Sequence, residues 1–469
     1  MDANLRNPPD MGSSFVSSDH HHSADVHVAA VTDGDDGEAR VEIRIDELIL
    51  GRPLQQPIYD ARGTLLLAEG KTITSDFKRL LKQRGLSTVR VDAESSSRLK
   101  MAQAPTHIAA VQLDTEIAAA LDRVIDSGLL TVQNRGKAVK HDVAVHGRTA
   151  YSQARVETVT KRQAEKSEQL GSLMKEALRG KGISTSTISQ AAVESLSDLA
   201  DDSDCVLAVA MRAHAREGLA EHSLKMSTLA MAIGIEMGLD EDNCKRLYVA
   251  GMVHDWGLAM LPEEISNPQQ PFTTEQYYQF KKHPILTAEI LQRMIDIPSM
   301  VAVISYQVHE RPNGLGYPRG RTGDRIHLFS RILAVTDAYA HLTAPKPWRP
   351  ALAPYSAMEA LIRLAREKDL DPEVVRSFLR LMTLFPIGSY ITLDDGSLAR
   401  VLRRNGEKYT QPIIQVFEDG NGDPVPADAP EALVDLADSV VNVVQALPTP
   451  GSEEVLLSED ILEETRRQL

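Results

Sequence analysis

Between residues 186 and 384, apolar side chains recur every three to four positions, which is the period of an amphipathic helix. In one stretch, Met226, Leu229, Ile233 and Met237 follow His222 at steps of 4, 7, 11 and 15 residues. These steps place all five side chains on one stripe of a helix, so His222 is predicted to face the protein interior. The segment is therefore predicted to be a helical bundle with an imidazole on an inward face.

A different pattern precedes the bundle. The stretch VEIRIDELIL, which begins at Val41, alternates apolar and polar residues, and PIYDARGTLLLAEG predicts two short strands around a turn at Asp60. A helix from Ser75 to Gly85 and a strand at residues 88–92 follow. We interpret residues 40–93 as a small N-terminal α/β module with a regulatory or packing role.

Short strands also follow the bundle. Residues 385–426 contain three apolar runs around the turns Asp395-Gly396 and Asn405-Gly406, which predicts a small antiparallel β extension. Residues 1–39 are polar and predicted to be a disordered tail. Residues 94–185 are rich in charge and are interpreted as a solvated helix or a linker, and residues 427–469 as an acidic, partly helical tail. The predicted fold class is mainly α, with a small β-containing segment on each side.

Composition narrows the functional classes. The chain of 469 residues carries a formal net charge of −15, which argues against a nucleic-acid polymer as partner because phosphate backbones need a basic face. Two cysteines are too few for a disulfide framework and fit a reducing cytoplasm. No run of about 18 apolar residues is present, so no membrane span is expected. We predict a cytoplasmic protein.

Metal-ligating side chains recur along the bundle. His254-Asp255, His283, His309 and Asp337 follow His222 at intervals of 26 to 32 residues, about one per helix-loop-helix unit. A lone buried histidine is most often simply hydrogen-bonded, but a carboxylate among aliphatic residues is costly unless it is paired or bound to metal. Several such groups on inward faces of one bundle are typical of a metal site. Two metals that share a carboxylate would suit phosphoryl transfer.

Four motifs around these residues resemble one known family. VAGMVHDWGLAMLPEEI is similar to the LLHDIGKIGIPDEIL segment of HD-GYP proteins, and KKHPILTAEIL is similar to their HP-x-x-G-x-x-IL segment. VHERPNGLGYPRG resembles HHERxDGxGYPxG, and RILAVTDAYAHLTAPKPWR resembles RIxAVADxYDALTSxRPYR. The resemblance covers residues 205–384 in the expected order. It implies an HD-type helical bundle and hydrolysis of the second messenger cyclic di-GMP.

The resemblance also implies residue roles. The first metal would be held by His222, His254, Asp255 and Asp337, and the second by His283 and His309, with Asp255 bridging and counted as catalytic. Divalent Fe or Mn is the expected metal, with one tight and one weaker site. The implied substrate-binding residues are Arg311, Gly314, Gly316, Tyr317, Pro318 and Lys346. Basic residues near these motifs, including Arg319, Arg321 and Arg349, are expected to attract phosphate.

Several positions depart from the family pattern. Val308 stands where the family has the first histidine of its pair, and Leu258 where it has a lysine. Ala340 and Asn313 each replace an aspartate, and Lys346 replaces an arginine, which removes a bidentate fork. The expected first set of metal ligands is complete, whereas the second set lacks one imidazole.

Three functions therefore stay open. The first is a metal-dependent phosphodiesterase for cyclic di-GMP or a related nucleotide, with reduced activity. The second is a catalytically degenerate receptor that binds the nucleotide or the metal and signals, and the third is an HD scaffold for partner proteins. A homodimer or a signalling protein partner is compatible with the first two.

Overall fold

The computed structural model describes residues 40–45, 48, 54, 56–71, 73, 75–92, 115–128, 131–180, 184–212 and 218–468. The predicted tail at residues 1–39 lies outside them. The chain divides into two compact units, Met1–Met101 and Ala102–Leu469. Within the described ranges, none of the helices combines the length and apolar character that a membrane span requires.

The first unit is a four-stranded antiparallel sheet with one helix. Its elements are β1 (Arg40–Arg44), β2 (Ile58–Tyr59), β3 (Leu65–Leu67), α1 (Ser75–Gln83) and β4 (Thr88–Asp92), and the strand order is β1-β4-β2-β3. Ile43, Ile58 and Val89 are buried in its core. Between β2 and β3 the Asp60 side chain accepts the backbone N–H groups of Arg62 and Thr64, which fixes the turn. This is the α/β arrangement predicted from the alternating pattern.

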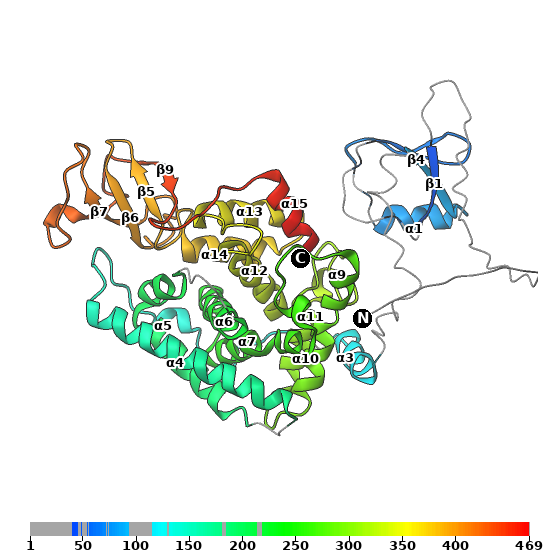
Figure 1. Cartoon of the computed structure of the whole chain (residues 1–469), viewed down its shortest axis with the longest axis horizontal. Helices are drawn as coiled ribbons and strands as arrows, with labels where there is room; N and C mark the ends of the chain where they lie inside the picture. Colours follow the sequence, from blue (N-terminus) through cyan, green and yellow to red (C-terminus); the bar gives the residue numbers. More distant parts are fainter. Residues whose placement is uncertain are drawn as a thin grey trace, which may run out of the picture. The chain divides into compact units, whose positions relative to one another are not determined.

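The second unit is built around helices (Figure 1). The helices before the GYP motif are α3 (Glu116–Asp126), α4 (Gln153–Leu178), α5 (Ser186–Ala210), α6 (Leu219–Glu236), α7 (Glu241–Val253), α8 (Glu263–Ser266), α9 (Thr274–Phe280), α10 (His283–Leu291) and α11 (Ser299–Gln307). Those after it are α12 (Leu328–Thr343), α13 (Pro354–Arg366), α14 (Pro372–Met382) and α15 (Glu459–Gln468). Short 3-10 turns, η2 (Val139–Asp142) and η3 (Trp256–Met260), lie between them. The mainly helical fold predicted from the sequence is confirmed.

Helix α4 corrects one interpretation of the region 94–185. The charged sequence favoured a solvated helix or a linker, but Val159, Leu170 and Ala177 of α4 lie in the main hydrophobic core with residues of α5 and α6. Ser152 caps the helix by accepting the backbone N–H of Arg155. The apolar residues of α4 are sparse but share one face, so the abundant charges on its other faces concealed a packed helix.

The C-terminal sheet is larger than the sequence indicated. Beside β5 (Tyr390–Leu393), β6 (Leu398–Arg403) and β7 (Ile413–Glu418), it contains β8 (Leu433–Asp435) and β9 (Val443–Leu447), in the order β8-β7-β6-β5-β9. The segment 427–469, interpreted as a tail, therefore supplies both edge strands. It also supplies α15, whose Leu462 joins the main core and whose Arg466 pairs with Asp369 at 3.4 Å. These strands are only three and five residues long, so their pattern was too weak to be recognised.

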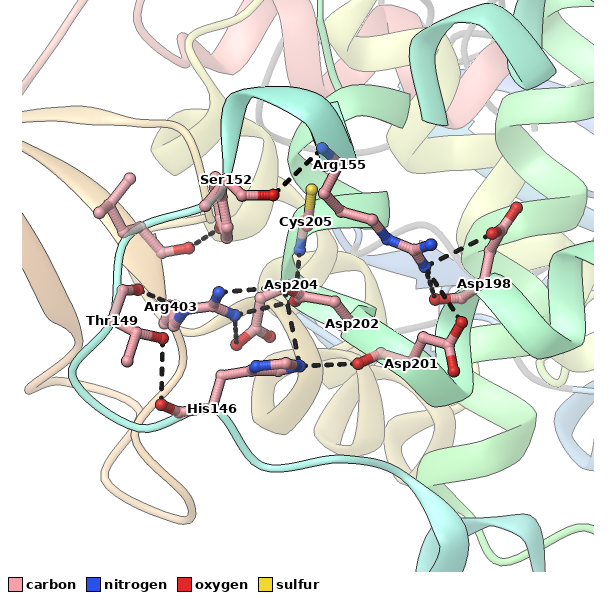
Figure 2. Close-up of polar contacts among 12 residues, drawn as sticks. His146, Thr149, Ser152, Arg155, Asp198, Asp201, Asp202, Asp204, Cys205 and Arg403 are labelled. Carbon is pink, nitrogen blue, oxygen red and sulfur yellow. Dashed lines mark hydrogen bonds and ion pairs between the residues drawn. The ribbon is translucent and has the colours of Figure 1, made fainter. Parts of the chain in front are cut away.

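A buried cluster of charged residues joins this sheet to the bundle (Figure 2). Arg403 of β6 is 2% exposed and donates two hydrogen bonds to Asp202 of α5, at 2.8 and 3.0 Å, and a third to the carbonyl of Thr149. Asp202 leaves the helical conformation and its carboxylate accepts the backbone N–H of Cys205, so it begins the second half of a kinked helix. Asp204 lies nearby, 3.4 Å from the Arg404 side chain.

Asp204 should make the stability of this unit depend on pH. Burial raises the pKa of this carboxyl to about 6, although Arg404 and Arg403 oppose the shift. Since the folded state holds the proton more tightly than the unfolded state, this group's contribution to stability is highest below about pH 4 and falls as pH rises to about 6. We expect Asp204→Asn to leave stability unchanged at pH 4 and to raise it by up to about 3 kcal/mol at pH 7.5. Urea unfolding at both pH values tests this, and a less stable variant at pH 7.5 would contradict it.

Candidate metal centre

The first group of ligating side chains lies where α6, α7 and α12 meet. His222 comes from α6, His254 and Asp255 from the end of α7, and Asp337 from the middle of α12. Their ligand atoms all lie within 4.8 Å of one another, with His222 Nε2 3.0 Å from Asp337 Oδ1 and His254 Nε2 3.1 Å from Asp255 Oδ2. Helix periodicity correctly indicated that these residues face inward. The structure thus brings together the four residues expected to hold the first metal.

A second group shares Asp255 with the first. His283, the first residue of α10, and His309, two residues after the end of α11, direct their Nε2 atoms to 3.2 and 3.6 Å from Asp255 Oδ1. The two imidazole Nε2 atoms are 2.8 Å apart. Each carboxylate oxygen of Asp255 thus faces a different histidine set, which is the arrangement of a bridging ligand.

Backbone carbonyls fix the orientation of two rings. His254 Nδ1 is 2.8 Å from the carbonyl oxygen of Gly251, and His283 Nδ1 is 2.8 Å from that of Phe280. A donated Nδ1–H leaves the lone pair on Nε2, as in most metal-binding histidines. Among the described residues, neither His254 Nε2 nor Asp255 Oδ1 has a hydrogen-bond partner although both are buried. Two of the converging ligand atoms thus lack a hydrogen-bond partner within the described part of the chain, and the nitrogen and oxygen set fits divalent metal ions.

The charges around the ligating side chains favour the ionised forms of Asp255 and Asp337, which are the forms that bind metal. Burial opposes ionisation of Asp255, but His254 and His283 outweigh it and hold the pKa of this carboxyl well below its usual value. The pKa of Asp337 is lowered in the same way by His341 and His222. Burial lowers the pKa of His309 to about 4, so its imidazole is neutral at pH 7 and its lone pair is available.

The GYP loop, residues 311–320, lies directly on the second group. The Tyr317 ring stacks on the His309 ring with an interplanar angle of 1° and 4.8 Å between centroids, and its backbone N–H donates to the His309 carbonyl at 2.9 Å. Gly316 makes this approach possible, because a Cβ there would lie 2.3 Å from the His309 carbonyl oxygen. Gly314 has a positive φ of 79°. The loop glycines therefore let a tyrosine cover a candidate ligand.

Arg311 is the most deeply buried cation of this loop. It is 2% exposed, and its Nη1 donates to the carbonyl of Val308 at 2.9 Å. Its Nε and Nη2 atoms, and the Tyr317 hydroxyl, have no hydrogen-bond partner among the described residues. A guanidinium with two unpaired buried nitrogens is suited to an anionic ligand such as a phosphate.

The wider basic cluster expected from the sequence is mostly neutralised by acids. Arg319 and Arg321 bind Asp122 of α3 at 2.9 and 2.7 Å, and Arg349 lies 3.9 Å from Glu464 of α15. The prediction that Arg319 and Arg321 attract phosphate is therefore corrected, because Asp122 binds both guanidinium groups. The buried Nε of Arg349 has no hydrogen-bond partner among the described residues, so attraction of phosphate by this arginine stays a prediction. Lys346 and Pro318 are half-buried.

The residues that depart from the family pattern are buried or half-buried. Val308 is fully buried in the main hydrophobic core, and Leu258 lies in the 3-10 turn after Asp255. Ala340 is fully buried in α12. Asn313 donates its side-chain N–H to Asp369 at 2.6 Å, a bond that an ionised aspartate could not make. This substitution ties the GYP loop to the connection between α13 and α14.

Sequence reasoning missed His341. It lies one helical turn after Asp337 on α12, with Nδ1 3.1 Å from Asp337 Oδ1, and its ring meets the His222 ring edge-on at 4.6 Å. Its Nδ1 is buried and makes no hydrogen bond with a described residue. The signal was available, because positions four apart share one helix face. The family pattern has alanine at this place, which directed attention away from it.

His341 should support the first metal. We expect His341→Ala to weaken metal binding by the first group about 10-fold and to leave binding by the second group unchanged. This is the smaller of the effects that are typical when a residue in contact with a metal ligand is removed. Chelator competition with purified protein measures both affinities. His141→Ala, which changes an exposed histidine on η2, is the matched control. Equal first-metal affinity in His341→Ala and wild type would contradict a role for His341.

Comparison with known proteins agrees with this geometry. Residues 203–374 match the HD domain family, which implies divalent-metal binding. This match lies within the helical region, and the predicted resemblance to the HD-GYP family is confirmed.

Three curated relatives illustrate the similarity. A cyclic di-GMP phosphodiesterase from Pseudomonas aeruginosa is 27% identical over 52% of this chain and 59% of its own length. The 3'3'-cGAMP-specific phosphodiesterase 1 of Vibrio cholerae is 32% identical over 34% of this chain and 37% of its own. A cyclic di-GMP phosphodiesterase from Borreliella burgdorferi is 25% identical over 39% of this chain and 47% of its own. The chain therefore spans less than two thirds of the length of each of these relatives.

The chain is also similar to solved structures. An HDG"Y"P protein from Bdellovibrio bacteriovorus is 16% identical, with a TM-score of 0.40 over 72% of this chain and 98% of that one.

Proposed function

We propose that the protein is a metal-dependent phosphodiesterase acting on cyclic di-GMP or a related cyclic dinucleotide. One observation carries this proposal: the Asp255 carboxylate lies between two histidine sets, 3.1 Å from His254 Nε2 and 3.2 Å from His283 Nε2. A carboxylate shared in this way is typical of two-metal centres for phosphoryl transfer. The names of the relatives from Pseudomonas, Vibrio and Borreliella support the same substrate class.

The metal pair would be held by six side chains, all of them nitrogen or carboxylate oxygen donors. His222, His254, Asp255 and Asp337 form the tighter half, and Asp255, His283 and His309 the weaker half. The absence of thiolates from these groups favours Fe or Mn over a structural zinc. When bound, the metals would neutralise phosphate charge and activate a water molecule for attack.

The protein's own side chains would orient the substrate. Arg311 offers two unpaired guanidinium nitrogens to a phosphate, and the Tyr317 hydroxyl adds a neighbouring donor. The Lys281 ammonium lies over the Tyr317 ring, 5.4 Å from its centroid, and would add positive charge beside the substrate. Gly314, Gly316, Pro318 and Lys346 complete the proposed substrate-binding set. These side chains would suit a compact phosphodiester with aromatic bases. We expect a cytoplasmic signalling protein that acts alone, as a homodimer or with a partner protein.

A second candidate function is a receptor that binds the nucleotide without turning it over. Val308 packs in the core and offers no lone pair to the second metal, and Leu258 offers no cation. Both losses weaken stabilisation of charge that develops during attack more than they weaken docking of the ground state. Affinity for the nucleotide should therefore survive better than the rate of hydrolysis.

The weak half of the centre gives a direct prediction. We expect Val308→His to raise the affinity for the second metal about 10-fold or more, because an additional imidazole replaces a water ligand. Stepwise metal titration of wild type and variant measures this, with Val308→Leu as the apolar control for the buried position. Two equally tight metals in the wild-type chain would contradict the proposed deficit.

Product analysis separates the enzyme from the receptor. Metal-loaded protein is incubated with cyclic di-GMP, 3'3'-cGAMP and a linear dinucleotide, and the products are resolved by chromatography. Metal-dependent cleavage of a cyclic dinucleotide, lost in Asp255→Asn, supports the enzyme. Binding without cleavage supports the receptor, and neither binding nor cleavage overturns both.

A further inference from the structure

Helix α3 packs against the two helices that position the second histidine group. Its apolar residues Ala118, Leu121 and Ile125 are buried in a small separate core with residues of α10 and α11. Helix α10 begins at His283, and α11 ends two residues before His309. Figure 1 shows α3 beside α10 and α11. The helix therefore contacts both elements that carry candidate ligands of the weaker half.

The acidic edge of α3 holds the end of the GYP loop. Asp122 Oδ2 accepts a hydrogen bond from Arg319 Nε at 2.9 Å, and Asp122 Oδ1 accepts one from Arg321 Nη2 at 2.7 Å. Asp126 accepts a further bond from Arg321 Nη1 at 2.6 Å. The side chains of Asp122 and Arg321 are only 18% and 10% exposed, so these charge-assisted bonds are partly shielded from water.

A second acid holds the backbone of Arg319 and Arg321. Glu310, which follows His309 and is 1% exposed, accepts the backbone N–H of Arg319 at 2.8 Å and that of Arg321 at 2.7 Å. Glu310 and Asp122 thus both hold the end of the loop. Tyr317, two residues earlier, is stacked on His309. A shift at Arg319 would therefore be transmitted over two residues to the ring that covers His309.

We propose that Asp122 of α3 is a positioning residue, which holds Arg319 and Arg321 so that Tyr317 stays against His309 and the second metal is retained. The inference rests on the proposed metal centre but not on hydrolysis.

The test uses the full chain and two measurements that do not depend on turnover. In Asp122→Asn, hydrogen exchange of the Arg319 and Arg321 amides should accelerate, and affinity for the second metal should fall about 10-fold, as for other outer partners of a ligand. Affinity for the first metal should not change. Asp122→Glu should restore much of the loss, and Glu116→Gln, which neutralises an exposed acid on the first turn of α3, should match wild type.

Three outcomes would overturn the inference. Unchanged second-metal affinity in Asp122→Asn would show that the loop is positioned without α3. Equal losses at both metals, together with a lower melting temperature, would show a general structural role. Equal effects of Glu116→Gln and Asp122→Asn would show that only net charge matters. Failure of the phosphodiesterase proposal alone, with metal binding intact, would leave this inference standing.

Discussion

Replacing Asp255 with asparagine should remove both metals, whereas replacing His309 with alanine should remove only one. Asp255 lies within ligand distance of both histidine groups, and no other residue of the two described groups is common to them. An amide keeps the shape but loses the charge that balances two divalent ions. In Asp255→Asn we expect the affinity for metal to fall by more than about 100-fold in each half of the centre. This exceeds the loss that is typical when a residue in contact with a metal ligand is replaced.

Elemental analysis of dialysed protein measures this difference as metal per chain. The control is Asp204→Asn, which makes the same chemical change in a buried position at the β6–α5 contact, away from the ligating groups. Retention of one tight metal in Asp255→Asn would contradict the bridging assignment. Loss of both metals in His309→Ala would show that the halves are not separable.

The second large effect concerns the buried ion pair between the bundle and the C-terminal sheet. We expect Arg403→Met to lower the free energy of unfolding by about 3–5 kcal/mol, because the buried Asp202 carboxylate would lose the two hydrogen bonds that Arg403 donates to it. Loss of the contact between the Arg403 guanidinium and the Tyr151 ring, at 4.6 Å, adds to the effect. Urea unfolding at pH 7.5 gives the difference.

A neighbouring arginine provides the control. Arg404 is more exposed and lies 3.4 Å from Asp204, so Arg404→Met should cost no more than about 1 kcal/mol. Asp202→Asn in the Arg403→Met background should recover part of the loss, since the unpaired charge is then removed. A variant Arg403→Met that unfolds at the wild-type urea concentration would contradict the assignment of this cluster as a joint between the sheet and the bundle.

The inward-facing candidate ligands could be predicted from the sequence, because helix periodicity determines which side chains share a face. His222, His254 and Asp337 lie on apolar stripes, and such stripes face a core regardless of how the helices pack. The strands of the N-terminal unit were predicted for a similar reason, since apolar and polar residues alternate regularly around Ile43 and Val89.

Contacts between distant segments could not be predicted in this way. The pairing of Arg319 and Arg321 with Asp122 joins residues almost 200 positions apart, and no local pattern encodes it. The same applies to Arg403 with Asp202 and to the edge strand β9, which pairs with β5 across some 50 residues. His341 is the exception, since its place on the Asp337 face was readable from spacing alone.

The central claim is that the metal centre and the GYP loop together bind a cyclic dinucleotide. Titration calorimetry of cyclic di-GMP into metal-loaded and metal-free protein tests it most directly. We expect saturable binding of one nucleotide per chain that requires metal and weakens in Arg311→Met, whether or not the nucleotide is then cleaved. Absence of binding to the metal-loaded protein, or equal binding with and without metal, would contradict it.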